Sequence, residues 1–327
     1  MKMIFLCERP ERIKDVYPKT VIDKLGICEN IFCKNDLYSN DFSNVEYVFS
    51  TWGMPVLTED EIKKYLPSLR AVFYAAGTVQ TFARPFLNCG VKVFSAWAAN
   101  AVPVAEYTVA QIILANKGMF RSSLTYHKNG RSKAREVATQ YIGNYNAKIG
   151  IIGAGMIGKL VIKMLKSYNL EVMAFDPFLP DDTATELGVK KVSLKTLFCE
   201  CDVVSNHLAN NEQTQGMLNK PLFESMKQNA TFINTGRGAQ VVENDLVSVL
   251  ENRPDITALL DVTFPEPPVE NHPFYTLENC ILTPHIAGSS GNEVWRMAEY
   301  MADEYEKLVS GNETNYEVTL KMLETMA

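Results

Sequence analysis

Three side chains in the second half of the sequence have types suited to moving a proton on a small bound acid: Arg237, Glu266 and His285. The arginine cation can hold a carboxylate. Histidine titrates near neutrality and can exchange a proton at physiological pH. A neighbouring carboxylate stabilises the charged imidazole. Each residue has a simpler alternative: a surface arginine, a loop glutamate and a core histidine.

Polar residues follow apolar, β-branched runs along this half of the chain. The runs 203–207, 231–234, 257–260 and 280–283 lead to His207, to Thr235-Gly236-Arg237-Gly238, to Asp261 and to His285. In an open parallel sheet the carboxyl ends of the strands line the ligand crevice. We therefore expect these residues to share one site, with His207 lining it and not acting as a catalyst.

The stretch from Lys148 to Asp176 predicts a strand, a glycine turn, a helix and a second strand. Its turn, Gly153-Ala154-Gly155-Met156-Ile157-Gly158, has the G-x-G-x-x-G spacing that lets backbone approach a pyrophosphate. The helix N-terminus adds unpaired N–H groups. Asp176 lies eighteen residues after Gly158, where an acid receives ribose hydroxyls and disfavours a ribose phosphate. A plain packing turn is the alternative, but the combination favours NAD.

Charge, hydropathy and cysteine spacing argue against several classes of protein. The 327 residues carry a net charge of −6, which argues against a nucleic-acid or anionic-membrane surface. The most apolar run, 102–115, is broken by Pro103 and Glu106 and is too short for a membrane span. Seven scattered cysteines lack metal-ligand spacing, so we expect no metal and reduced thiols in a cytoplasmic protein.

The elements that must position these residues alternate along the chain. Strand-like and helix-like runs alternate over 1–97 and again after 176, which predicts an α/β fold with parallel, helix-flanked sheets. One long helix is expected over 99–121, with Pro103 in its first turn. The polar stretch 126–147 is interpreted as a loop or short helix. A last amphipathic helix is expected over 292–309.

Five ordered blocks resemble the D-isomer-specific 2-hydroxyacid dehydrogenases. They are the glycine turn, NAVPVAEYTVAQIIL (100–114), INTGRGAQVVENDL (233–246), LDVTFPEPP (260–268) and TPHIAGSS (283–290). The resemblance implies that Arg237 binds the substrate carboxyl and carbonyl, that His285 is the general acid/base, and that Glu266 is its partner. It also implies that Asp261 holds the nicotinamide carboxamide of NAD.

The same resemblance implies a wider set of contacts. On the cofactor side it includes Gly153, Gly155, Met156, Ile157, Gly158, Asp176, His207, Thr214, Thr235, Gly236, Arg237, Asp261, His285 and Gly288. On the substrate side it includes Ala76, Gly77, Asn100, Arg237 and His285. Met156 departs from the family, because many members have a basic residue near the diphosphate at this position.

The resemblance further implies two Rossmann-like or flavodoxin-like domains with parallel sheets. A substrate domain of residues 1–98 and 292–327 would be interrupted by an NAD-binding domain of residues 99–291. Catalysis would occur in the cleft, and a homodimer would form through the helix region 100–121. The sequence thus predicts an NAD-dependent oxidoreductase for small D-2-hydroxy or 2-oxo acids. The alternative is a non-catalytic, NAD-sensing corepressor-like protein. Formate dehydrogenase is disfavoured, since that branch is expected to have glutamine at Glu266.

Overall fold

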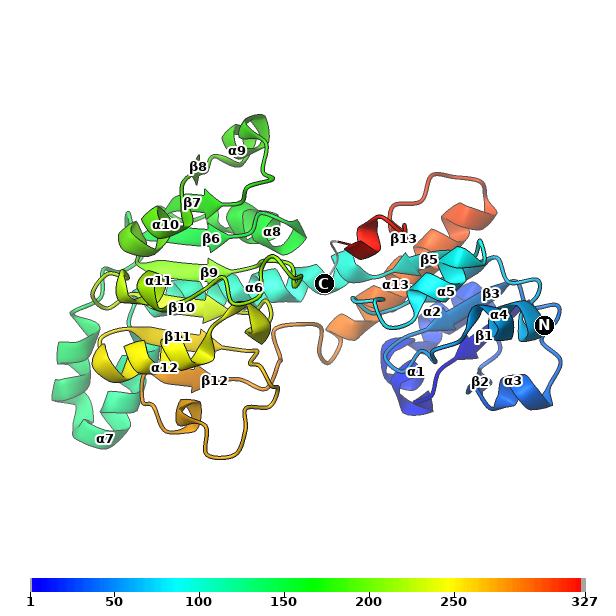
Figure 1. The fold of residues 1–327 in the computed structure, drawn as a ribbon, viewed down its shortest axis with the longest axis horizontal. Helices are drawn as coiled ribbons and strands as arrows, with labels where there is room; N and C mark the ends of the chain where they lie inside the picture. Colours follow the sequence, from blue (N-terminus) through cyan, green and yellow to red (C-terminus); the bar gives the residue numbers. More distant parts are fainter. Residues whose placement is uncertain (1, 325–327) are drawn as a thin grey trace. The chain divides into compact units, whose positions relative to one another are not determined.

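The computed structural model describes residues 2–324 and folds as two compact α/β units. Unit 1 comprises Met1–Asn100 and Ser289–Ala327, and unit 2 comprises Ala101–Gly288. The predicted domain limits lie within three residues of these divisions. Unit 2 is therefore an insertion in the chain of unit 1, which is an α/β arrangement of the predicted class (Figure 1).

Unit 1 is built on a six-stranded sheet in the order β13-β5-β4-β3-β1-β2. All neighbouring strands are parallel except β13, which runs antiparallel to β5. Its strands are β1 (Met3–Leu6), β2 (Ile31–Phe32), β3 (Tyr47–Ser50), β4 (Ala71–Tyr74), β5 (Lys92–Ser95) and β13 (Glu317–Val318). Its helices are α1 (Pro10–Val16), α2 (Lys19–Leu25), α3 (Asp36–Ser39), α4 (Glu59–Tyr65), α5 (Ala83–Asn88) and α13 (Glu293–Val309).

Helices cover both faces of this sheet, because the strands are apolar on both sides. On one face α1, α2 and α13 pack over a row of phenylalanines, in which the rings of Phe73 and Phe49 stack with centroids 5.0 Å apart. On the other face α4 and α5 cover residues such as Val48 and Val72. Helix α13 thereby brings the C-terminal part of the chain into the core of the N-terminal part.

Unit 2 is built on a seven-stranded, wholly parallel sheet in the order β12-β11-β10-β9-β6-β7-β8. Its strands are β6 (Lys148–Ile152), β7 (Glu171–Phe175), β8 (Lys190–Lys191), β9 (Val203–Asn206), β10 (Thr231–Asn234), β11 (Thr257–Leu260) and β12 (Cys280–Leu282). The strand order reverses between β6 and β9. In such sheets the reversal creates the crevice where ligands bind at the carboxyl ends.

Helices again cover both faces of the sheet. The longer ones are α6 (Trp97–Asn116), α7 (Met119–Ala138), α8 (Met156–Leu165) and α12 (Glu243–Asn252). The shorter ones are α9 (Asp181–Leu187), α10 (Leu194–Glu200) and α11 (Lys220–Glu224). Helices α6, α8 and α9 pack on one face, and α10, α11 and α12 pack on the other (Figure 1).

The helical region after residue 97 differs from its prediction in three ways. One helix over 99–121 was expected, but the chain turns at Gly118 (φ 63°) and separates α6 from α7. A Cβ atom at Gly118 would lie 2.3 Å from the ring of Tyr141. The stretch 126–147 is helical as far as Ala138, with non-helical backbone at Gly130. Pro103 lies inside α6 and not in its first turn.

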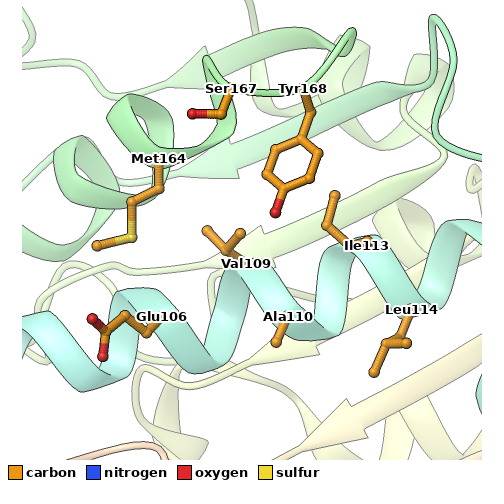
Figure 2. A pocket seen from close by; sticks show the side chains of 8 residues that line it. All are labelled: Glu106, Val109, Ala110, Ile113, Leu114, Met164, Ser167 and Tyr168. Atoms are coloured by element: carbon orange, nitrogen blue, oxygen red, sulfur yellow. The ribbon is translucent and has the colours of Figure 1, made fainter.

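By length and composition α6 is apolar enough to cross a membrane, contrary to the expectation from the sequence. However, 56% of its most apolar stretch of 18 residues is buried within the protein. Ala105, Val109 and Ile112 pack against the sheet of unit 2. Such burial is also found in core helices. An open groove remains beside α6, with a volume of about 580 Å³, and Figure 2 shows Val109, Ile113 and Tyr168 along it.

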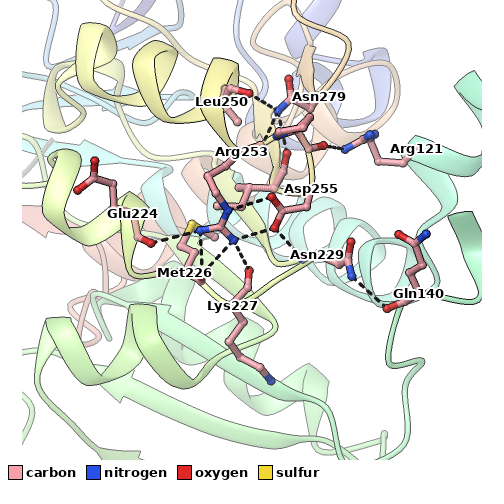
Figure 3. A network of polar contacts seen from close by, with 12 residues as sticks. Arg121, Gln140, Glu224, Met226, Lys227, Asn229, Leu250, Arg253, Asp255 and Asn279 are labelled. Carbon is pink, nitrogen blue, oxygen red and sulfur yellow. Dashed lines mark hydrogen bonds and ion pairs between the residues drawn. The ribbon is translucent and has the colours of Figure 1, made fainter.

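The amino ends of the unit 2 strands are joined by a polar network (Figure 3). Arg253 donates two hydrogen bonds to the carboxylate of Asp255, from Nε at 2.9 Å and from Nη2 at 2.7 Å. Asn279 donates to Ile256 O at 3.0 Å, and Asn229 donates to Gln140 O at 3.3 Å. These contacts hold the loops before the strands, at the edge opposite to the carboxyl ends.

Candidate active site

The glycine turn after β6 has the close backbone contacts that its spacing predicts. Gly153 adopts φ +86°, and a Cβ atom there would lie 2.8 Å from the carbonyl oxygen of His207. A Cβ atom at Gly158 would lie 2.0 Å from Gly153 O, so only glycine lets α8 start this close to the strand. By contrast, a Cβ atom at Gly155 would meet none of the described residues within 4 Å. That open space over backbone at a helix N-terminus fits a diphosphate.

Asp176 lies at the end of β7 and is tied to this turn. Its Oδ2 accepts a hydrogen bond from Ala154 N at 2.7 Å, and its Oδ1 accepts one from Phe178 N at 2.8 Å. The carboxylate is half-buried and keeps further lone pairs for hydroxyl donors. Met156 is exposed next to the turn. The residues present therefore fit the diphosphate and ribose of a dinucleotide, with a carboxylate where a ribose phosphate would be repelled.

His207 follows β9 and is buried against the glycine turn. Its Nε2 shares a hydrogen bond of 2.9 Å with Ser205 Oγ, and burial lowers the pKa of His207 to about 3. The ring is consequently neutral at pH 7, which agrees with a pocket-lining role and not with acid/base work. Thr214 Oγ1 donates to Ala209 O at 2.7 Å, so this side chain stabilises the loop after β9.

The turn after β10 holds Arg237 close to the loop after β11. Arg237 Nη1 donates a hydrogen bond to Gly236 O at 2.8 Å. Burial lowers the pKa of Arg237, and the negative charge of Glu266 opposes this shift. At Gly238 a Cβ atom would lie 2.0 Å from the carbonyl carbon of Thr263, so glycine is required where the two loops meet. A partly desolvated guanidinium of this kind binds a carboxylate more strongly than one in water.

Three buried amides beneath this turn were not predicted from the sequence. We call Asn206, Asn234 and Gln240 the buried amide cluster; each has at most 1% of its surface exposed. Asn206 Nδ2 donates to Asn234 Oδ1 at 3.0 Å and to Gln240 Oε1 at 2.6 Å. The signal available in the sequence was the presence of amides at two strand ends and just after Arg237.

Asp261 organises the loop that carries His285. It is buried, and its Oδ1 accepts hydrogen bonds from Thr283 Oγ1 at 2.6 Å and from Ile286 N at 2.9 Å. Its Oδ2 accepts from Ala287 N at 2.9 Å. His285 itself has φ +54°, an uncommon conformation for a residue with a side chain. The three hydrogen bonds that Asp261 accepts from this turn offset the energetic cost of that backbone conformation.

His285 and Glu266 meet as the sequence predicted. The His285 Nδ1 and Glu266 Oε1 atoms are 2.7 Å apart, and about half of each side chain is exposed. The bond fixes which imidazole nitrogen faces the carboxylate, and within residues 2–324 Nε2 has no hydrogen-bond partner. The charge of Glu266 also acts on Arg237, and all three residues belong to unit 2. The arrangement can bind an anion and exchange one proton with it.

The remaining residues that were predicted to contact cofactor or substrate are divided between the two units. In unit 2, Thr235 Oγ1 is buried and lies 3.2 Å from Thr108 Oγ1. In unit 1, the loop after β4 is held by Ser95, whose Oγ donates to Ala76 O at 3.0 Å and to Gly77 O at 2.6 Å. Ala76 N already donates to Tyr74 O, so within residues 2–324 the free backbone donor of this pair is Gly77 N.

Asn100 and Gly288 complete the predicted set. Asn100 Oδ1 accepts a hydrogen bond from Ser289 N at 3.0 Å, within unit 1. A Cβ atom on Gly77 would lie 3.7 Å from Asn100 Nδ2, so these two predicted substrate contacts are neighbours. Gly288 ends unit 2, directly after the loop that Asp261 holds.

Comparison with known proteins places the chain in a family. The profile of the D-isomer specific 2-hydroxyacid dehydrogenase NAD-binding domain matches residues 109–287, which is more than half of the chain. The protein therefore belongs to the D-isomer specific 2-hydroxyacid dehydrogenases, and unit 2 contains their NAD-binding domain. The predictions of the family, of the two-domain α/β fold and of NAD as cofactor are confirmed.

Individual relatives have different activities. A glyoxylate reductase from Korarchaeum cryptofilum is 30% identical over 246 residues, covering 74% of this chain and 74% of that protein. A D-3-phosphoglycerate dehydrogenase from Bacillus subtilis is 32% identical over 232 residues, covering 68% of this chain and 42% of that protein. The chain matches between 42% and 59% of the length of several curated relatives.

A solved structure shows the same fold over nearly the whole chain. The phosphoglycerate oxidoreductase from Rhizobium etli matches with a TM-score of 0.79 and 20% identity, covering 97% of both chains. At this identity the likeness concerns the fold alone.

Proposed function

We propose that this protein transfers a hydride between NAD(H) and a small D-2-hydroxy or 2-oxo acid. The observation that carries the proposal is the His285–Glu266 pair, with Nδ1 and Oε1 2.7 Å apart, in the same unit as Arg237 and the NAD-binding turn. Bound NADH would supply the hydride. The side chains of this chain would supply the proton and the anion site.

Arg237 would hold the carboxylate and the carbonyl oxygen of a 2-oxo acid. Its partly buried guanidinium donates one hydrogen bond to Gly236 O and has further N–H groups for a ligand. A substrate carboxylate would also offset the desolvation of this cation. Gly77 and Asn100 of unit 1 remain predicted substrate contacts.

His285 would exchange the proton with the substrate oxygen. With Nδ1 bonded to Glu266, its Nε2 is the atom that gives a proton to the carbonyl oxygen during reduction and takes it back during oxidation. Glu266 stabilises the charged imidazole in between. The turn held by Asp261 keeps the ring in place during this exchange.

The cofactor residues would act through positions that the structure already restrains. Asp176 would accept the ribose hydroxyls, and the open backbone at Gly155 would face the diphosphate. Asp261 already accepts three hydrogen bonds, but a carboxylate has about four lone-pair sites, so one remains for the nicotinamide carboxamide.

Turnover of NADH with 2-oxo acids of graded side-chain size tests the proposal. The His285→Ala variant should lose at least about 100-fold in kcat and still bind NADH. An exposed histidine, His127, gives the matched control: His127→Ala should behave as the wild type. Full activity of His285→Ala would show that the acid/base assignment is wrong.

Two alternatives predict other outcomes of the same experiments. A corepressor-like protein would bind NADH and turn over no 2-oxo acid. A formate dehydrogenase would reduce NAD with formate, but Glu266 argues against this activity, since glutamine is expected there.

We also propose that two copies associate through the 100–121 region, as the family resemblance implies. The groove of α6 is lined mainly by apolar side chains, including Val109, Ile113 and Leu114 (Figure 2). An apolar helix of a second copy would cover these side chains, and the Glu106 carboxylate at the groove would stay in contact with water or pair with a cation of that copy. Light scattering should give a dimer for the wild type and a smaller species for Leu114→Arg. A monomeric wild type would contradict this interface.

A further inference from the structure

The buried amide cluster satisfies its hydrogen-bonding groups through two separate loops. Its members come from the end of β9 (Asn206), the end of β10 (Asn234) and the short helix after Arg237 (Gln240). Buried amides of this kind are stable only when their donors and acceptors are paired. Where these pairs lie therefore shows which segments the cluster restrains.

On one side the cluster holds the backbone of the Arg237 turn. Arg237 N donates to Gln240 Oε1 at 3.2 Å, and Arg237 O accepts from Asn234 Nδ2 at 3.2 Å. Gly236 N donates to Asn234 Oδ1 at 3.1 Å. Both main-chain polar groups of Arg237 are thus fixed from below, and the guanidinium is presented from a restrained backbone.

On the other side the cluster holds the loop after β9. Gln240 Nε2 donates to Leu208 O at 2.8 Å and to Ala209 O at 3.0 Å. Asn206 Oδ1 accepts from Leu208 N at 3.2 Å. This loop begins at His207, whose backbone contacts Gly153 of the NAD-binding turn.

Gln240 therefore joins the two segments through a single side chain. Its oxygen bonds to the Arg237 turn, and its nitrogen bonds to the His207–Ala209 loop. A shift of either segment would leave buried amide groups without partners, which is costly in a low-dielectric interior. The two segments are consequently expected to move together.

We propose that Gln240 and Asn206 are positioning residues that couple NAD(H) binding at the His207–Ala209 loop to 2-oxo acid binding at Arg237. The inference rests on the proposed function, because it assigns the two loops to cofactor and substrate. It adds that occupancy of one side orders the other, so that the affinities of the two ligands depend on each other.

The coupling is measured as the change in NADH affinity caused by oxamate, an unreactive analogue of a small 2-oxo acid. NADH binding is followed by its fluorescence in the absence and in the presence of saturating oxamate. For the wild type we expect oxamate to tighten NADH binding by about fivefold or more. The variant Gln240→Met keeps the side-chain volume and removes all four hydrogen bonds. It should bring this factor close to one.

Steady-state kinetics give a second measurement on the same variants. Displacement of Arg237 should lower kcat/KM of Gln240→Met for the 2-oxo acid by up to about 100-fold. The matched control is Gln215→Met, an exposed glutamine of the same loop region, which should keep wild-type coupling and kinetics. Asn206→Leu removes the hydrogen bonds of Asn206 to Asn234, Gln240 and Leu208. This variant is measured in the same way if Gln240→Met does not fold.

The double variant Asn206→Leu/Gln240→Met tests whether the two residues act as one unit. Its loss in kcat/KM should be smaller than the product of the two single losses. A wild type without oxamate coupling, or variants that keep it and lose only thermal stability, would overturn the inference. A wild type that binds NADH and oxamate cooperatively but turns over no 2-oxo acid would instead count against the proposed function.

Discussion

The burial of His207 makes the stability of the folded protein depend on pH. Its pKa in the folded protein is lowered from the ordinary 6.5 to about 3, because burial disfavours the charged ring. Between these values the unfolded chain binds one proton more than the folded protein does. The free energy of unfolding must therefore rise with pH across this window, by about 1.4 kcal/mol per pH unit.

The lowered pKa of His207 makes the protein less stable at acidic pH. Stability due to neutral His207 is fully present above pH 6.5 and is lost as the pH falls towards 3. Between pH 7 and pH 5 the titrating interval is about 1.5 units, which corresponds to about 2 kcal/mol. For a unit of this size that free energy shifts the melting temperature by about 4–8 °C.

The assay is thermal unfolding at pH 7 and pH 5, followed by circular dichroism in the absence of cofactor. A separate scan with NADH identifies the transition of unit 2, because NADH binding raises its midpoint. His207→Gln retains a polar atom for Ser205 but cannot be protonated, so its midpoint should fall by about 4–8 °C less than that of the wild type. His127→Gln, at an exposed position, should keep the wild-type response. Equal falls for wild type and His207→Gln would refute the reasoning.

Three further substitutions test the Arg237 turn, the loop of His285 and a helix cap in unit 1. Gly238→Ala places a Cβ atom 2.0 Å from the Thr263 carbonyl carbon, so steady-state assays should show kcat/KM for the 2-oxo acid lowered by about 100-fold; unchanged kinetics would contradict the close packing. Asp261→Asn replaces one of the two oxygens that accept hydrogen bonds from the loop of His285 by an NH2 donor, and it should lower the free energy of unfolding by about 1–3 kcal/mol in urea titrations. Thr58→Ala removes a capping box in unit 1 and should cost about 1 kcal/mol of stability, with kcat and KM unaltered.

The sequence alone determined the features that depend on neighbours along the chain. Strands β10 and β11 have the predicted bounds, since a short β-branched run flanked by turn residues has few alternatives. The glycine turn was predictable for the same local reason. The pairing of His285 with Glu266 followed from family blocks whose order and spacing are specific.

Helix limits in α6 and α7 were less predictable, because they depend on distant contacts. Gly118 breaks the helix where Tyr141 packs against it, and the polar composition of α7 favoured the prediction of a loop. Pro103 is accommodated inside α6, although the local rule places proline in a first turn.

Only the tertiary structure decided how the site residues are held. Asp261 and His285 are far apart in the sequence, and the parallel sheet brings the ends of β11 and β12 together so that one carboxylate fixes the other loop. The buried amide cluster arises in the same way from the ends of β9 and β10. Residue types and local spacing specify which chemistry is available. Hydrogen bonds between neighbouring strand ends specify its geometry, and those partners are chosen by the order of strands in the sheet.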